Sequence, residues 1–200
     1  KSIMKLLPST ARIKQGSIRV CGQDITACKE REMCKLRGKI FSMVFQDPMA
    51  VLNPTMTIRK QIEEAIRIHQ PQLGNVERVE KVVELMQLVG IENARERMAL
   101  YPHNFSGGMR QRIVMAIALA ADPSVLFADE PTTALDVTIQ AQILDLFKSI
   151  QKKKGMATVF VSHDLGVVAR VADRVAVMYA GKIVEIGMAE EIFYDPKHPY

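Results

Sequence analysis

The order of apolar and polar positions predicts a chain in which strands alternate with helices. Residues 125–128 are consecutive apolar residues, and such a run is typical of a strand covered on both faces in a parallel sheet. Further runs predict strands at residues 17–21, 40–45 and 157–161, and helices at residues 27–36, at residues 137–153 and after Asp164. Because the elements alternate, we expect an α/β fold whose main core is a mostly parallel sheet with right-handed crossovers.

The middle of the chain has a different pattern, with apolar residues at helical spacing. They recur over residues 58–66 and 79–89, after a turn at residues 53–54. Ser106 is a suitable N-cap for the next helix. We therefore expect a single partial domain, residues 1–200, made of three parts: residues 1–54, an inserted α-helical subdomain at residues 55–115, and a core at residues 116–200.

Both ends of the chain have recognisable patterns. Residues 175–179 and 183–186 flank Ala180-Gly181-Lys182 and predict a hairpin, followed by a short helix at residues 189–193. Apolar residues between Ile3 and Leu7 predict the last turns of a helix that stops before Pro8. A helix without a beginning suggests that the sequence is N-terminally truncated.

Composition narrows the class of protein. The chain has 200 residues, 48% of them hydrophobic, which suffices for a core, and its net charge of +5 is only weak support for an anionic partner. Its three cysteines form no C-x-x-C pair, which argues against a zinc site or a disulfide framework and fits a reducing cytosol. No window is apolar enough for a membrane span, and the basic run at residues 152–154 fits a helix end better than a nucleic-acid contact.

Two adjacent carboxylates follow the apolar run at residues 125–128. Asp129 and Glu130 fall at the carboxyl end of the predicted strand, where open α/β sheets bind their ligands. Asp129 could hold Mg²⁺, through water, while Glu130 could orient or deprotonate a water that attacks a γ-phosphate. The alternative is that the D-E-P sequence simply ends a strand at a turn.

A second candidate site lies at residues 105–112, F-S-G-G-M-R-Q-R. Ser106, Gly107 and Gly108 stand at the start of a predicted helix, where unpaired amides and the positive end of the helix dipole attract phosphate. Glycines would also let the backbone approach a ligand closely. Ser-Gly-Gly is equally a good loop and cap, so the motif alone leaves both interpretations open.

Taken in order, the motifs resemble the ATP-binding-cassette (ABC) family. Gln46 matches the Q-loop glutamine, residues 106–108 the signature, residues 125–130 the Walker B strand, Asp136 the D-loop and His163 the switch histidine. The resemblance covers essentially the whole chain. It implies a P-loop NTPase-like (RecA-like) fold, binding of ATP and Mg²⁺, and ATP hydrolysis.

The resemblance also implies roles for these residues. Gln46 would contact Mg²⁺ or the attacking water and report the nucleotide state to a membrane partner. Asp129 would help to hold the metal, Glu130 would be the general base, and His163 would contact the γ-phosphate.

Two cassettes of the family sandwich two ATP molecules head to tail. Ser106, Gly107 and Gly108 would therefore serve the ATP bound by a second cassette, and Asp136 would lie at the dimer seam. A single copy would complete neither site.

One family motif has no match in the 200 residues, the phosphate-binding loop G-x-x-x-x-G-K-[ST]. Lys1-Ser2 is similar to the end of that loop, but Leu6-Leu7-Pro8 follows too soon for the helix that the family places there. We expect the true loop upstream of residue 1, and therefore expect this chain alone to bind ATP poorly and to be inactive.

Within the family, three segments resemble the bacterial importers of dipeptides, oligopeptides and nickel: F-Q-D-P-M-A-V-L-N-P-T-M-T-I, Y-P-H-N-F-S-G-G-M-R-Q-R and D-P-K-H-P-Y. Peptide import is the leading interpretation and nickel import the alternative. The resemblance implies transmembrane permease subunits, an extracytoplasmic substrate-binding protein acting indirectly, a place on the cytoplasmic face of the membrane, and no nucleic acid. Cassette ATPases of DNA repair or translation, and a non-hydrolytic regulatory fragment, are further alternatives.

Overall fold

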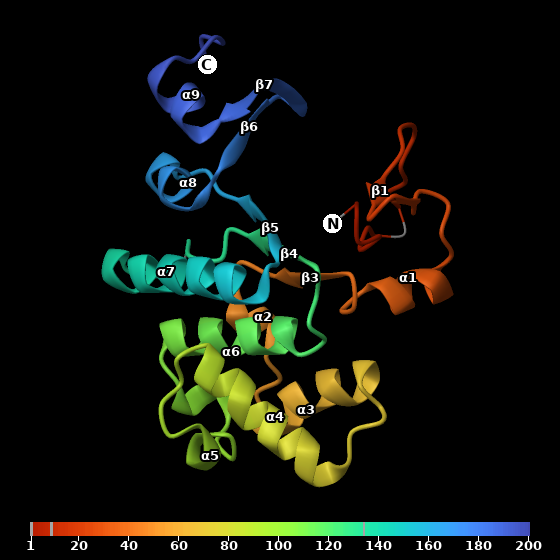
Figure 1. Cartoon of the computed structure of the whole chain (residues 1–200), viewed down its shortest axis with the longest axis vertical. Helices are drawn as coiled ribbons and strands as arrows, with labels where there is room; N and C mark the ends of the chain where they lie inside the picture. The colour runs from red at the N-terminus through yellow and green to blue at the C-terminus, as the bar shows by residue number, and fades with distance from the viewer. Residues whose placement is uncertain (1, 9, 134) are drawn as a thin grey trace.

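The computed structural model describes residues 2–8, 10–133 and 135–200, and a three-stranded parallel sheet forms its centre (Figure 1). The strands are β3 (Phe41–Val44), β4 (Val125–Asp129) and β5 (Ala157–Val161), in the order β3-β4-β5. The prediction of a parallel sheet is confirmed. β5 has the predicted bounds, whereas β3 is one residue shorter at each end than residues 40–45.

Two hydrophobic clusters cover the two faces of β4. Leu126 and Ala128 are fully buried in the larger cluster, which also contains residues of the helix α7 (Val137–Lys154). Val125 and Phe127 are half-buried and pack against a smaller cluster built around Met4, Ile25, Met33 and Phe41. The apolar run at residues 125–128 therefore reflects a strand covered on both faces, as expected.

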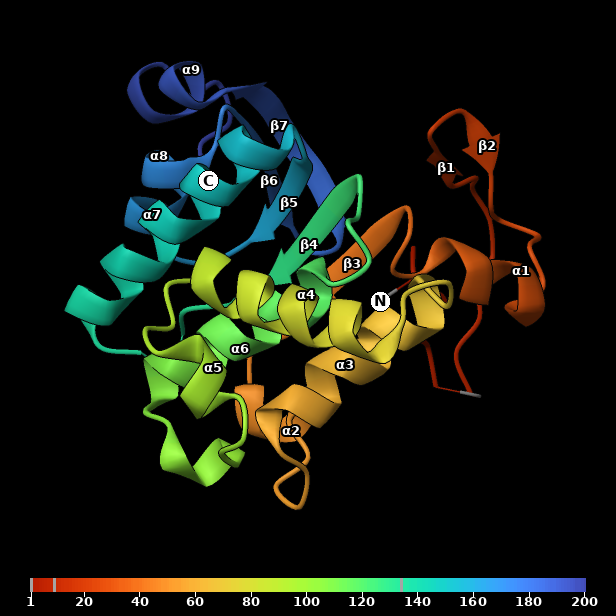
Figure 2. The ribbon, with the colours of Figure 1, turned by 60° about the horizontal axis from the view of Figure 1, so that its bottom comes forward.

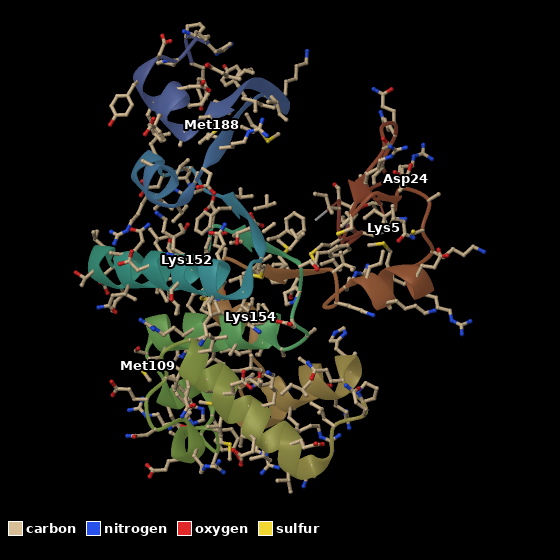
Figure 3. All side chains as sticks on the ribbon, in the orientation of Figure 1. Lys5, Asp24, Met109, Lys152, Lys154 and Met188 are labelled. Atoms are coloured by element: carbon tan, nitrogen blue, oxygen red, sulfur yellow. The ribbon has the colours of Figure 1, made fainter. Side chains whose placement is uncertain are left out.

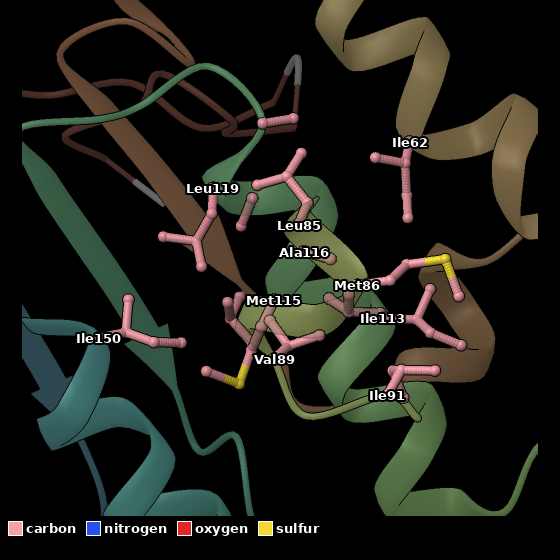
Figure 4. Close-up of a cluster of buried hydrophobic side chains, with 14 of the residues drawn as sticks. Ile62, Leu85, Met86, Val89, Ile91, Ile113, Met115, Ala116, Leu119 and Ile150 are labelled. Atoms are coloured by element: carbon pink, nitrogen blue, oxygen red, sulfur yellow. The ribbon is translucent and has the colours of Figure 1, made fainter. Parts of the chain in front are cut away.

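A helical layer lies beside the sheet and forms most of the larger cluster (Figures 1 and 4). We use this name for α3 (Ile58–His69), α4 (Asn75–Leu88), α5 (Ala94–Arg97) and α6 (Gly107–Leu119). Side-chain caps start two of them: Thr57 accepts a hydrogen bond from the Lys60 amide and Ser106 from the Met109 amide, each at 3.4 Å. The short helix α2 (Pro48–Val51) lies between β3 and the layer, and the 3₁₀ helix η1 (Pro102–Asn104) lies between α5 and α6.

The predicted helix end at residues 3–7 is wrong. Residues 2–5 form a turn instead, closed by a 3.1 Å hydrogen bond from the Lys5 amide to the Ser2 carbonyl. Lys5 has a φ of +51°, and a left-handed residue cannot continue a right-handed helix. Spaced apolar residues packed into the smaller cluster produced the helical pattern, because Met4 is buried and Ile3 partly buried there without being helical.

The predicted strand at residues 17–21 shortens to β1 (Arg19–Val20), which pairs antiparallel with β2 (Gln23–Asp24) outside the central sheet. Cys21 and Gly22 both have positive φ, +49° and +80°, so a tight turn follows Val20 directly. The next helix, α1 (Glu30–Leu36), begins later than the predicted residue 27.

The chain ends in a C-terminal unit that stands beyond α8 (Leu165–Val171) (Figures 1 and 2). We use this name for β6 (Arg174–Tyr179), β7 (Lys182–Met188) and α9 (Ala189–Tyr194). The strands form a separate antiparallel pair, which confirms the predicted hairpin. Its loop is one residue shorter than predicted because Lys182 already pairs with Tyr179.

The larger hydrophobic cluster extends across the predicted boundary between residues 115 and 116, and α6 passes through it. The division into three parts therefore stays a prediction. Across the described residues, none of the helices combines the length and the apolar character that crossing a membrane requires.

Candidate functional site

The candidate site lies where the three parallel strands end. Gln46 follows β3 by two residues, Glu130 comes directly after β4, and His163 follows β5 by two residues. Parallel neighbours end at the same edge of a sheet, so residues far apart in sequence meet there. The structure thus brings together three of the predicted site residues from three separate strands.

Glu130 is the centre of this group. Its Oε2 accepts hydrogen bonds from Gln46 Nε2 at 3.2 Å and from Thr133 Oγ1 at 3.0 Å, and its Oε1 lies 3.0 Å from His163 Nδ1. The Glu130 amide donates to the Val161 carbonyl at 2.9 Å, which fixes its backbone to the end of β5. Both carboxylate oxygens are therefore held by neighbouring side chains.

The backbone at Glu130 is unusual. Its φ is +47°, a left-handed conformation that is costly for a residue with a side chain. Such conformations cluster at functional sites, where the surrounding structure holds them in place. Here the strand ends at this residue, and the carboxylate turns toward the side chains that follow β3 and β5.

Hydrogen bonds from His163 and then from Thr133 lower the pKa of Glu130 below its usual range. The group is therefore a carboxylate at neutral pH, which is the form that a general base needs. The side chains are accessible to water, since His163 is 70% exposed and Glu130 is 27% exposed. The arrangement can accept a proton from a water molecule bound nearby.

The donor set fits Mg²⁺ held jointly with a ligand rather than by protein alone. Among the described residues, no group of three or more His, Cys, Asp or Glu side chains is placed to hold a metal ion. Mg²⁺ is usually bound by one or two carboxylates together with phosphate and water. Asp129 at the end of β4 and the amide oxygen of Gln46 could supply such ligands, and both assignments stay predictions.

The signature residues lie outside the hydrogen-bonded group around Glu130. Ser106 caps α6, and a Cβ on Gly108 would come within 2.5 Å of Ile139 Cγ2 on α7, so any larger residue there would force Ile139 to shift. A Cβ on Gly107 would meet Leu135 Cδ2 at an ordinary 3.7 Å. Packing within the chain thus explains Gly108, and the predicted contact of these residues with a second cassette's ATP stays a prediction.

Asp136 has a structural task within the chain. Its Oδ1 accepts a hydrogen bond from the Ile139 amide at 3.0 Å and caps the start of α7. Its neighbour Val137 is 81% exposed, so this helix start lies at the surface. The predicted place of Asp136 at a dimer seam stays a prediction.

Sequence reasoning missed two features of the site. Thr133 holds Glu130, and the only signal was its place in the D-E-P-T-T turn. The contact between His163 and Glu130 was also missed, because the expectation placed His163 on a phosphate. The left-handed backbone at Glu130 makes both contacts possible, and this conformation is not readable from a glutamate in a sequence.

The parallel sheet with its side chains at the carboxyl edge defines a P-loop NTPase-like α/β fold. Solved structures with the same fold are ABC cassettes. One is cbiO1 of Clostridium perfringens, part of the ABC transporter complex cbiONQ, with a TM-score of 0.81 and 26% identity over 97% of this chain and 72% of that chain. Another is the cassette MJ0796, a dimer in a post-hydrolysis state bound to ADP and Pi, with a TM-score of 0.76 and 25% identity over 88% of this chain and 74% of that chain.

The chain belongs to the ABC transporter family, whose model matches residues 1–133. Similar curated proteins include two from Bacillus subtilis (strain 168): the oligopeptide transport ATP-binding protein OppD, 56% identical, and the dipeptide transport ATP-binding protein DppD, 54% identical. The oligopeptide transport ATP-binding protein AmiE of Streptococcus pneumoniae is 54% identical. All of this chain is covered in each case, and it spans between 56% and 60% of the relatives' length.

Proposed function

We propose that the chain is part of the ATP-binding and ATP-hydrolysing subunit of a bacterial ABC importer that takes up dipeptides or oligopeptides. The observation that carries the proposal is the carboxylate of Glu130, held between Gln46 and His163 where three parallel strands end. A single ordered carboxylate at this edge of the sheet suits phosphoryl transfer to water, which needs positioning and charge neutralisation more than covalent chemistry.

In this proposal Glu130 is the general base. Its lowered pKa keeps it ionised, and His163 and Thr133 fix the direction of its two oxygens. Gln46 reaches the same carboxylate and would orient the water that attacks the γ-phosphate. His163 would face that phosphate from the strand β5, and Asp129 would be a ligand of Mg²⁺. Bound Mg²⁺ supplies charge neutralisation on the phosphates.

The signature residues and Asp136 are assigned in this proposal to the contact with a second cassette. Ser106, Gly107 and Gly108 would bind the phosphate of ATP held by a second cassette, with Asp136 at the seam between them. The G-x-x-x-x-G-K-[ST] loop has no match in the 200 residues, and we assign it to other residues of the intact protein. Residues 1–200 alone should then turn over little ATP.

Membrane partners would contact the segment after Gln46. Met49 is 48% exposed and Val51 37% exposed on the short helix α2, and exposed apolar side chains suit a protein contact. Transmembrane permease subunits are the proposed occupants, on the cytoplasmic face of the membrane, with an extracytoplasmic substrate-binding protein acting indirectly. Peptide is favoured over nickel as cargo because the relatives OppD, DppD and AmiE are ATP-binding proteins of oligopeptide or dipeptide transport.

The substitution Glu130→Gln tests the proposed function. In the intact ATPase assembled with its partners, we expect ATP turnover to fall by about 10²-fold or more, the usual contribution of a general base, while ATP binding is retained. The control is Glu80→Gln, which removes an exposed carboxylate paired with Arg95 on the helical layer and should leave turnover unchanged. Steady-state phosphate release and equilibrium nucleotide binding measure the two properties.

Undiminished turnover by Glu130→Gln would refute the assignment of the base. The cargo needs a separate measurement, uptake of labelled dipeptide, oligopeptide and Ni²⁺ by proteoliposomes that contain the complex. ATP-dependent uptake of Ni²⁺ without peptide would favour the nickel alternative and would leave the ATPase assignment intact.

A further inference from the structure

Three consecutive residues at the start of α6 connect this helix to three other segments. Arg110 Nε donates to the Pro102 carbonyl at 2.9 Å, Gln111 Nε2 to the Phe45 carbonyl at 3.5 Å, and Arg112 Nη1 to the Val89 carbonyl at 2.9 Å. Pro102 lies in η1, and Val89 follows α4. The contact of Gln111 differs from the other two because its acceptor residue, Phe45, directly precedes Gln46, a residue of the candidate site.

Gln111 is only 1% exposed. A buried amide without a partner is costly, so its hydrogen bond to the Phe45 carbonyl must be kept or replaced. Phe45 lies between the end of β3 and Gln46, and Gln46 in turn donates to Glu130 at 3.2 Å. A chain of contacts thus leads from α6, the signature helix that begins at Gly107, through the Phe45 carbonyl and Gln46 to the proposed base Glu130.

Helix α6 also contacts the other end of the segment formed by residues 45–49. Arg110 Nη1 lies 3.2 Å from the Met49 sulfur. Between these two contacts the segment borders a cavity of about 150 Å³, lined by Gln46, Asp47, Pro48, Met49, Gly107, Arg110, Gln111, Pro131 and Leu135. A cavity offers fewer packing contacts than a filled core, so the polar contacts have a larger share in fixing this segment.

We propose that Gln111 is a positioning residue that holds Gln46 in place from the signature helix. This inference rests on the proposed function, since Gln46 acts there on the attacking water. A phosphate that binds at Ser106–Gly108 and shifts the start of α6 would move Phe45 and therefore Gln46. The signature residues Ser106–Gly108 and the hydrogen-bonded group around Glu130 would then be linked within one chain, through the buried side-chain amide of Gln111.

Hydrogen exchange tests the contact without reference to ATP turnover. Gln111→Met keeps the length of the side chain and removes the donor. We expect the backbone amides of residues 45–47 and 49 to exchange about 3- to 10-fold faster, the effect of losing one buried hydrogen bond; Pro48 has no amide hydrogen. The matched control is Arg112→Met, which removes the contact with the Val89 carbonyl and should accelerate exchange near residues 89–91 instead.

Kinetics test the positioning role in the intact ATPase. Gln111→Met should lower kcat by about 3- to 10-fold with little change in KM for ATP. Combined with Gln46→Ala, it should cause no further loss, because the side chain that it positions is already absent. Arg112→Met combined with Gln46→Ala should show the sum of the two single effects. If Gln111→Met unfolds, Gln111→Leu replaces it, since it also lacks the donor and places no charge in this buried position.

The outcomes separate this inference from the proposed function. Unchanged exchange at residues 45–49, or full additivity of Gln111→Met with Gln46→Ala, would overturn the positioning role. Full turnover by Glu130→Gln would overturn the proposed function, while faster exchange at residues 45–49 would still support the contact between α6 and the Gln46 segment.

Discussion

The helical layer and the C-terminal unit contain the same kinds of apolar side chain but bury them to very different extents. Ile62, Met86 and Ile113 are 0% exposed in the helical layer (Figure 4), whereas Met178 and Ile183 of the hairpin are 60% and 56% exposed. Two methionines labelled in Figure 3 belong to the two regions, Met109 near the start of α6 and Met188 at the end of β7. Met109 packs against the larger cluster, while Met188 is 49% exposed.

This difference shows that apolar content alone does not stabilise a segment. The hydrophobic contribution follows the area removed from water, so an exposed isoleucine adds little. The helical layer gains its stability from a dry core. The hairpin of β6 and β7 depends more on the hydrogen bonds between its strands and on hydrogen bonds of its side chains. The carboxylate of Glu185, for example, accepts hydrogen bonds from the Lys197 and His198 amides at 2.9 and 2.8 Å.

The largest effect is expected from one substitution made in both regions. Ile62→Ala removes a fully buried side chain and should lower the free energy of unfolding by about 2–5 kcal/mol. Ile183→Ala removes a side chain that is 56% exposed and should change it by about 0.5 kcal/mol or less. Chemical denaturation followed by circular dichroism measures both, and equal losses would contradict the comparison.

Replacing one glycine by alanine in each region should give the next largest losses in the free energy of unfolding, for two different reasons. Gly108→Ala should cost about 1–3 kcal/mol because the new Cβ would lie 2.5 Å from Ile139 Cγ2. Gly181→Ala, with a φ of +78° and open space around it, should cost about 1 kcal/mol through backbone strain alone.

A second substitution separates these two causes. Ile139→Ala should relieve part of the cost of Gly108→Ala, so that the double variant is less destabilised than the sum of the single variants. No relief is expected when Ile139→Ala is combined with Gly181→Ala. Thermal unfolding of the three single and two double variants provides both cycles, and strict additivity at Gly108 would exclude a steric cause.

The sequence predicted closely the bounds of two elements with a clear local pattern, β5 and α7. β5 has the predicted bounds, and α7 ends one residue beyond residue 153, just before Gly155, which adopts the left-handed conformation of a helix stop. The turn at residues 2–5 was missed because buried apolar residues at helical spacing are indistinguishable from a helix until their backbone is seen.

The candidate site was predictable in its residues but not in its contacts. Glu130 could be chosen from its place after an apolar run, whereas Gln46 and His163 were predicted through the resemblance to the ABC family. Their mutual hydrogen bonds depend on a left-handed glutamate and on the strand order β3-β4-β5. The contact of Gln111 with Phe45 was likewise hidden, since it joins residues far apart in sequence.

The smallest expected effect concerns the hydrogen bonds that the Glu185 carboxylate accepts in the C-terminal unit. Backbone hydrogen bonds from Lys197 and then from His198 lower the pKa of Glu185. A carboxylate with a lowered pKa stabilises the folded form at pH values above the usual glutamate pKa of about 4.3, and this contribution is lost as the pH falls through the lowered value. Acid should therefore loosen residues 195–200 before it affects the apolar core of the helical layer.

The amide proton shifts of Lys197 and His198, followed by NMR from neutral to acidic pH, measure this directly. They should show a transition with a midpoint below the usual glutamate pKa, and Glu185→Gln should remove that transition because the neutral amide cannot ionise. Amide shifts near Ile113 should stay constant over the same range, since α6 contains no Asp, Glu or His side chain. A midpoint at or above the usual value would show that the two amides do not hold the carboxylate in solution, and the C-terminal unit would then depend on its strand ladder alone.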